Sequence, residues 1–232
     1  MTEHTIKQFD AELVEIRNRV LQMGGLVEHQ IVKAMEGFTD GDLLILDQVI
    51  DNDDRVNAEE VSLDEACSHI IAKRQPAASD LRMIMMVIKT ITDLERIGDE
   101  AKKIAKMAKR LHSGEASFVP RIELRHVAQL AIEMLRKALD AFARLDVSAS
   151  YDIVRQDKEV DTEFRGITRQ LITFMMGDPR TISSSLEILF MAKSIERIGD
   201  HSKNISEYVV YMVKGRDVRH TGIEGIRREI EP

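Results

Sequence analysis

Apolar side chains recur along the N-terminal part of the chain in alternating steps of three and four residues. This alternation places them on one face of a helix and is typical of the seam of an antiparallel bundle or coiled coil. Gly24 and Gly25 interrupt the seam, and a glycine pair inside a helix indicates close packing or a slight kink. The seam residues are Ile6, Phe9, Leu13, Ile16, Val20, Met23 and Val27.

The same periodicity predicts five further helices and no strand. Gln75-Pro76 should end the second helix, because a residue before proline avoids the helical region. Gly177-Asp178-Pro179 reads as a turn, with Asp178 as the N-cap and Pro179 at the first helical position of the sixth helix. The expected helices cover about 42–73, about 79–111, 124–145, 153–174 and 179 to about 214.

The sequence Glu-Arg-Ile-Gly-Asp occurs twice, at 95–99 and at 196–200, in the third and sixth predicted helices. Such a repeat indicates a duplicated unit, so we predict an all-α fold of two pseudo-symmetric antiparallel three-helix bundles. A polar, glycine-punctuated tail follows, and we expect it to be loosely attached. The predicted parts are 1–114 for the first bundle, 115–214 for the second and 215–232 for the tail, with the linker at 113–120.

An aspartate interrupts the apolar seam in each half. In the second helix the three-four rhythm calls for an apolar residue at position 53, and Asp53 is there. In the fifth helix Asp157 lies at the matching place, and Asn57 and Asp161 follow four residues later on the same faces. A carboxylate that faces a bundle interior costs several kcal/mol unless another group compensates its charge.

Each repeated motif adds two more carboxylates to this arrangement. Glu95 and Asp99 share a helix face, as do Glu196 and Asp200, because residues i and i+4 lie on one side of a helix. Packed beside the aspartate helices, they would gather three or four oxygen-bearing side chains in each half. Hard metal cations prefer such oxygen ligands.

Two other interpretations of these acids remain open. They could lie on solvated helix faces, with a like-charge penalty of about 0.2–0.5 kcal/mol, or pair with Arg96 and Arg197 in a purely structural role. A ferritin-like di-iron site is disfavoured, since it needs a Glu-x-x-His from each of two helices. The chain has one, Glu123 to His126, on the fourth helix and away from the acid motifs.

Composition narrows the class of protein. The 33 Lys and Arg residues against 40 Asp and Glu give a net charge of −7 without a long basic run, which argues against nucleic acid as a partner. Twelve Met and no Trp suit a helical protein. No stretch approaches the roughly 18 apolar residues of a membrane span, and the N-terminus lacks the order of a signal peptide. We therefore expect a cytoplasmic protein.

Several segments together resemble the PhoU family, the accessory regulators of the bacterial phosphate-specific transport system. The resemblance runs from about Thr5 to His220. The segments that carry it are 9–13 (Phe-Asp-Ala-Glu-Leu), 23–25 (Met-Gly-Gly), 70–76 (Ile-Ile-Ala-Lys-Arg-Gln-Pro), the two Glu-Arg-Ile-Gly-Asp copies and 213–220 (Val-Lys-Gly-Arg-Asp-Val-Arg-His).

The resemblance implies a function that the spacing of residues does not show. Members of the family are non-enzymatic, and they signal phosphate sufficiency by engaging two partners. These are the ATPase subunit of the phosphate ABC transporter and the membrane sensor histidine kinase of the phosphate regulon; uptake falls and the regulon stays off. The resemblance also implies a cytoplasmic homodimer that binds divalent or trivalent metal ions (Mg, Mn, Ca, Fe or Zn).

Carried over position by position, the family's metal ligands fall on the acid motifs. They would be Asp53, Asn57, Glu95 and Asp99 in the first half and Asp157, Asp161, Glu196 and Asp200 in the second. Because Asn57 offers a neutral amide where the second half has Asp161, we expect the first site to bind metal less tightly. No catalytic residue is predicted. The main alternative is a metal-storage or metal-dependent protein that uses the same carboxylates.

Overall fold

The computed structural model describes residues 2–113, 118–219 and 221–230, and these residues form helices and no strand. The first half contains α1 (Thr2–Asp40), α2 (Leu43–Arg74) and α3 (Ala78–His112). The second half contains α4 (Arg125–Arg144), α5 (Ala149–Gly177), the short 3-10 helix η1 (Pro179–Thr181) and α6 (Ile182–Lys214). A last helix, α7, covers Gly222–Ile230.

The predicted helix ends are confirmed where local chemistry sets them. Gln75 adopts a left-handed backbone (φ 47°) immediately before Pro76, and α2 stops there. Asp178 accepts a hydrogen bond from the backbone N–H of Arg180, and Pro179 is the first residue of η1. This turn reverses the chain between α5 and α6.

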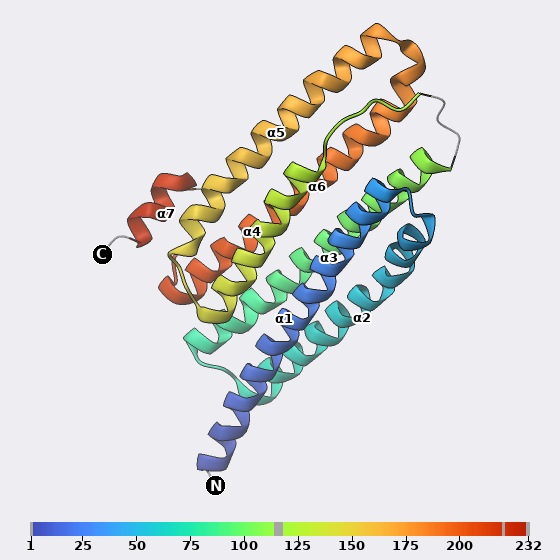
Figure 1. Ribbon diagram of the computed structural model, residues 1–232. Helices are drawn as coiled ribbons and strands as arrows, with labels where there is room; N and C mark the ends of the chain where they lie inside the picture. Colours follow the sequence, from blue (N-terminus) through green and yellow to red (C-terminus); the bar gives the residue numbers. More distant parts are fainter. Residues whose placement is uncertain (1, 114–117, 220, 231–232) are drawn as a thin grey trace.

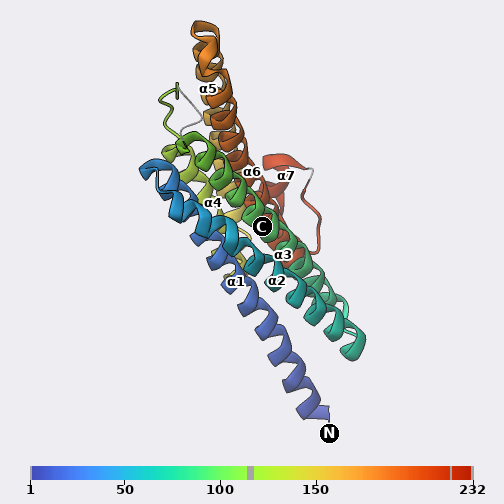
Figure 2. The ribbon, with the colours of Figure 1, turned by 90° about the vertical axis from the view of Figure 1, so that its right-hand side faces the viewer.

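The central pair of helices, α3 and α6, makes the most extensive helix–helix contact of the molecule. α1 and α2 pack on α3, and α4 and α5 pack on α6, so the two halves repeat one arrangement (Figure 1). Seen from the side, the long helices α1 to α6 follow the long axis of an elongated molecule, and α7 lies across it (Figure 2). The predicted all-α fold of two pseudo-symmetric three-helix bundles is confirmed.

The apolar seams predicted from periodicity form the core. Cys67, the only cysteine, is fully buried among them, and burial raises the pKa of its thiol to about 12. It is therefore an inert core residue, as its helical setting predicts. The buried seam residues of α2 are Leu46, Val49, Val56, Leu63, Cys67 and Ile70.

The glycine pair of α1 marks close packing between the two bundles. A Cβ on Gly24 would lie 2.6 Å from Cδ2 of Leu139 on α4, whereas a Cβ on Gly25 would meet nothing within 4 Å. Gly24 therefore lets α1 approach α4, and its neighbour faces open space. The helix continues through both residues.

The two glycines provide a matched pair of substitutions. Gly25→Ala should stabilise the protein by about 0.5–1 kcal/mol, since alanine suits a helix interior better than glycine. Gly24→Ala should lose that gain and cost about 1 kcal/mol or more, because Leu139 must move out of its packed position. Urea unfolding of both variants measures the difference, and equal shifts would show that α1 and α4 are not in close contact at Gly24.

The described part of the tail packs against the second bundle, so the expectation of a loosely attached tail is wrong. Val218 is 2% exposed and Ile226 of α7 is fully buried, and they pack with Val154 of α5 and Val210 of α6. The sequence pattern did not indicate this packing, because Val218 and Ile226 are far apart in a polar, glycine-containing segment. The tail forms a small second core against the second bundle (Figure 1).

Removing the α7 anchor should have a measurable cost. Ile226→Ala is expected to destabilise the protein by about 2–4 kcal/mol, because it leaves a cavity in the small core. Val213→Ala is the control, since Val213 is exposed near the end of α6 and its truncation should change stability by less than about 0.5 kcal/mol. Matching thermal shifts for the two variants would mean that the tail contributes no packing energy.

Some expectations fall on residues outside the described part of the chain. These are residues 114–117, within the predicted linker and at the expected boundary between the bundles, and His220 at the end of the family-like segment.

Candidate functional site

Asp53 lies inside the first bundle, as the interrupted seam predicts. The residue is 1% exposed, and its Oδ2 accepts a hydrogen bond from Nζ of Lys102 on α3 at 2.8 Å. Asn57 also reaches Oδ2 through its side-chain amide, at 3.4 Å. The buried carboxylate is therefore paired with a lysine that the sequence interpretation did not include.

Buried oxygen atoms remain without a hydrogen-bond partner beside this pair. Among the described residues, Oδ1 of Asp53, Oδ1 of Asn57 and Oε1 of Gln30 on α1 have none. A Cβ on Gly98 would lie 3.4 Å from the Gln30 oxygen and 3.7 Å from the Asp53 oxygen, so both face the same point of α3. Their chemistry suits a hard cation, and Gln30 is a candidate ligand that the periodicity did not reveal.

Glu95 and Asp99 lie half-buried on α3 in the same half. The pKa of Glu95 is raised, first by burial and then by the charge of Asp99, with smaller contributions from Glu60 and Asp53. A carboxylate whose pKa is raised by neighbouring carboxylates lies in a negative field, which a bound cation would relieve.

The second half repeats this arrangement with differences. Asp157 is 8% exposed and its Oδ2 accepts a hydrogen bond from Nζ of Lys203 at 2.7 Å; the same Nζ lies 3.8 Å from Oδ1 of Asp200. Burial, followed by the charge of Glu196, raises the pKa of Asp200. Nζ of Lys193 lies 2.5 Å from Glu196 Oε2.

The eight candidate ligands are thus only partly brought together. Asp161, the partner expected beside Asp157, instead lies 3.9 Å from Arg165 on the solvent side of α5. Within the described residues, no group of three or more Asp, Glu, His or Cys side chains is positioned to hold a metal ion. The first half, with its unpaired amide and carboxylate oxygens, fits a cation better than the second, where Met134 faces Gly199 at the place of Gln30.

Lysines form the ion pairs of Asp53, Asp157 and Glu196, where one interpretation of the sequence assigned that role to arginines. Arg197 pairs with Glu100 of the opposite bundle at 3.2 Å. The sequence held a signal for the lysines, because the repeat continues to a lysine three residues after each motif aspartate: Asp99 to Lys102 and Asp200 to Lys203.

The contact between the bundles contains a second set of buried polar groups. Nδ1 of His201 lies 2.7 Å from Oδ1 of Asp93, and Asn204 donates to the same oxygen at 3.4 Å. Burial raises the pKa of Glu100, but hydrogen bonds from Lys103 and Ser194 outweigh it, so the net pKa is lowered. These pairs hold α3 against α6.

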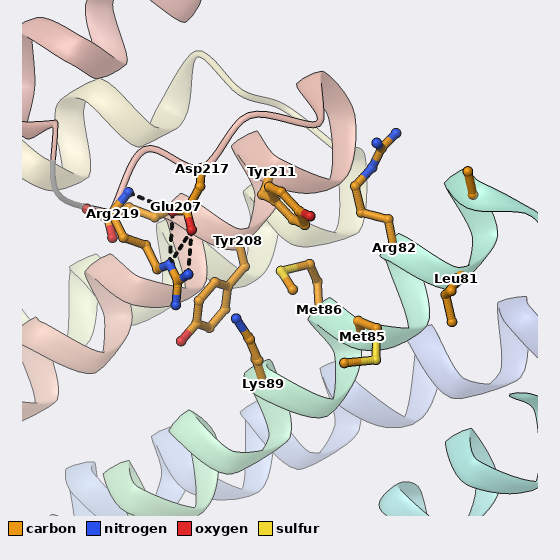
Figure 3. A pocket seen from close by; sticks show the side chains of 11 residues that line it. Leu81, Arg82, Met85, Met86, Lys89, Glu207, Tyr208, Tyr211, Asp217 and Arg219 are labelled. Atoms are coloured by element: carbon orange, nitrogen blue, oxygen red, sulfur yellow. Dashed lines mark hydrogen bonds and ion pairs between the residues drawn. The ribbon is translucent and has the colours of Figure 1, made fainter.

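A cavity of about 420 Å³ lies between α3, α6 and the tail (Figure 3). Nζ of Lys89 lies 5.7 Å from the centre of the Tyr208 ring, and Arg219 of the tail is paired with Asp217. Burial raises the pKa of Glu207 to about 7. The lining residues are Ala78, Leu81, Arg82, Met85, Met86, Lys89, Glu207, Tyr208, Tyr211, Asp217 and Arg219.

Comparison with known proteins decides the family. The model of the PhoU domain matches the chain twice, at residues 20–108 and 124–209. The chain belongs to the PhoU family. All eight candidate ligands lie within the two matched segments, whereas the tail and α7 lie beyond them.

Proteins named as PhoU or PhoU homologs are similar in sequence to this chain over nearly its whole length. A Pseudomonas aeruginosa protein named phosphate-specific transport system accessory protein PhoU homolog is 46% identical over 100% of this chain and 96% of its own length. The Escherichia coli (strain K12) protein named phosphate-specific transport system accessory protein PhoU is 49% identical over 96% of this chain and 92% of its own.

Solved PhoU structures have the same fold. The crystal structure of PhoU from Pseudomonas aeruginosa matches with a TM-score of 0.85 at 46% identity, covering 90% of this chain and 100% of that one. The phosphate transport system regulatory protein PhoU from Streptococcus pneumoniae matches with a TM-score of 0.84 at 28% identity, covering 90% and 99%. Among the described residues, no helix has the length and apolar character needed to cross a membrane.

Proposed function

We propose that this protein is a non-enzymatic negative regulator of phosphate uptake and of the phosphate regulon. The observation that carries the proposal is the identity of 46–49% to phosphate-specific transport accessory proteins over at least 96% of the chain. Identity at this level, spread over both bundles, supports a shared role for the whole molecule and not for one motif.

The protein would act as an adaptor between two membrane systems. One partner is the ATPase subunit of the phosphate ABC transporter, and the other is the sensor histidine kinase of the phosphate regulon. A pair of packed bundles offers separate surfaces to two partners at once, which supports this mode of action over turnover of a substrate. We place the adaptor in the cytoplasm, as a homodimer, without nucleic acid as a partner.

A gene deletion tests the regulatory role. In phosphate-rich medium, a strain without this gene should show raised alkaline phosphatase activity, and the intact gene should restore repression. Activity that stays low in the deletion strain would contradict a negative regulator. Metal-linked chemistry at the carboxylates would then become the leading function.

We also propose that the acid motifs bind divalent or trivalent metal ions, with Mg, Mn, Ca, Fe and Zn as candidates. The unpaired buried oxygens of Asp53, Asn57 and Gln30 and the raised pKa values of Glu95 and Asp200 support this proposal. A bound ion would supply the positive charge that these groups need. Asp53, Asn57, Glu95 and Asp99 would hold it in the first half. Asp157, Glu196 and Asp200 would hold it in the second, joined by Asp161 if that side chain turns away from Arg165.

Metal content separates this proposal from a purely structural role of the acids. Elemental analysis after dialysis against each metal should show less bound metal in the double variant Asp157→Asn/Asp161→Asn than in the native protein. The matched variant Asp53→Asn should remove metal from the first half. Unchanged content in both variants would support the structural interpretation.

A further inference from the structure

Two equivalent grooves run between α3 and α6, related by the internal repeat. The two copies of Glu-Arg-Ile-Gly-Asp define which residues of α3 and α6 correspond, because position 95 of α3 matches position 196 of α6. In this register Lys89 corresponds to Phe190, and Lys106 corresponds to Glu207. The cavity in Figure 3 is one groove, and a cavity of about 390 Å³ beside Phe190 is its counterpart.

The protein's own tail covers the first groove. Asp217 and Arg219 line it from outside, and Val218 between them is buried (Figure 3). The tail brings a charge pair of its own to this groove, because Arg219 donates hydrogen bonds to Asp217. The first groove therefore holds both signs of charge, with Arg82 and Lys89 on α3 and Glu207 on α6.

The second groove is more basic than the first, with Glu100 as the single acidic residue of its lining. Lys106 occupies the position that corresponds to Glu207, and within the described parts of the chain it has no acidic partner. Lys103 and Arg197 share the single carboxylate of Glu100, at 2.9 and 3.2 Å, which leaves positive charge unmatched. The lining residues are Glu100, Lys103, Lys106, Met107, Arg110, Phe190, Lys193, Ser194 and Arg197.

An apolar stripe continues this groove along α6. Ile182, Leu186 and Phe190 follow one another at intervals of four residues and are exposed, Phe190 by 56%. Met107 is buried at the floor of the groove. A helical row of exposed apolar side chains with cations beside it fits the apolar face of an amphipathic segment.

We propose that this groove docks an acidic amphipathic segment of a partner protein. Its apolar side chains would lie against Phe190 and Leu186, and its carboxylates would pair with Lys106 and Lys103. Charge complementarity argues for this occupant, because Lys106, Lys103 and Arg197 present more positive charge than the carboxylate of Glu100 balances. The inference rests on the proposed function, since an adaptor needs a surface for at least one partner.

The test uses the full-length protein and a defined probe, a fluorescein-labelled helical peptide composed of Glu and Leu. Anisotropy should show saturable binding that weakens with added salt. The variant Phe190→Ala/Lys106→Glu should bind the peptide at least about tenfold more weakly, since it removes the apolar anchor and reverses the charge. The control Val61→Ala/Lys73→Glu changes an exposed valine and an exposed lysine of α2 and should bind as the native protein does.

The same variants in cells separate this inference from the proposed function. In a deletion strain with raised alkaline phosphatase, the control gene should restore repression and the groove variant should not. Full repression by the groove variant, or equal peptide binding by all three proteins, overturns the groove while the regulatory role stands. Conversion of the native dimer to a monomer by the groove variant in light scattering overturns it too, because the occupant would then be a second copy of this chain. Low phosphatase activity in the deletion strain itself overturns the proposed function, whatever the peptide shows.

Discussion

Replacing Lys102 with alanine is expected to remove about 3 kcal/mol from the free energy of unfolding in metal-free buffer. The substitution leaves the carboxylate of Asp53 buried without its charged partner, and an uncompensated buried charge costs about 3–5 kcal/mol. The lower end applies, since Lys102 is partly exposed and water can approach its place. The double variant Lys102→Ala/Asp53→Ala should recover much of the loss, because it removes both charges.

Lys103→Ala is the matched control for this prediction. Lys103 is exposed and shares Glu100 with Arg197, so its loss should cost less than about 1 kcal/mol. Urea unfolding with chelator present measures all three variants. In parallel measurements without chelator, added Mn or Mg should stabilise Lys102→Ala more than the native protein, since a cation can take the place of the ammonium group. A Lys102 variant as stable as the Lys103 variant would show that the buried pair is not coupled.

Replacing Glu207 with glutamine is expected to stabilise the protein by about 2 kcal/mol at about pH 8. Burial raises the pKa of this carboxyl from its ordinary 4.5 to about 7. Between these values the folded state holds a proton that the unfolded state has released. The stability of the native protein therefore falls as pH rises from 4.5 to 7 and stays lower above that window. Glutamine carries no charge and avoids this loss.

The difference between the two proteins should vanish at about pH 4, where the carboxyl of Glu207 is protonated in both states. Glu224→Gln is the control, since Glu224 lies exposed on α7 and its replacement should change stability little at any pH. Thermal unfolding across the pH range gives the comparison. A stability gain for Glu207→Gln that is the same at low and high pH would show that ionisation of Glu207 is not its cause.

The core of the fold could be predicted because the apolar seam and the repeated motif both indicate how the helices pack. Asp53 and Asp157 interrupt a regular apolar rhythm, and burial at those positions follows from helix geometry alone. The duplicated Glu-Arg-Ile-Gly-Asp sequence likewise predicts two like bundles. Both inferences depend on short-range spacing along single helices, which a sequence displays directly.

The remaining features depend on contacts between distant segments. Lys102 pairs with Asp53 across two helices, and spacing along one helix shows neither the distance nor the direction of its side chain. Gln30 approaches the same point from α1, where it reads as an ordinary polar residue. The tail anchor Ile226 buries itself against α5 and α6 through a tertiary contact that its polar neighbours conceal.

The halves also differ more than their sequences suggest. Asn57 alone predicts weaker metal binding in the first half, yet that half holds the unpaired oxygens of Gln30 and Asp53. The second half presents Met134 at the place of Gln30. Separate metal titrations of Asp53→Asn and Asp157→Asn decide which of these effects dominates.

The proposed adaptor role is tested most directly by the mass of a complex in solution. The purified protein is mixed with the transporter's ATPase subunit and the cytoplasmic part of the sensor kinase, and light scattering after gel filtration gives the composition of each species. An adaptor should give one species that contains all three proteins. Displacement of one partner by the other, or failure of both to bind, would contradict an adaptor that links the transporter to the kinase.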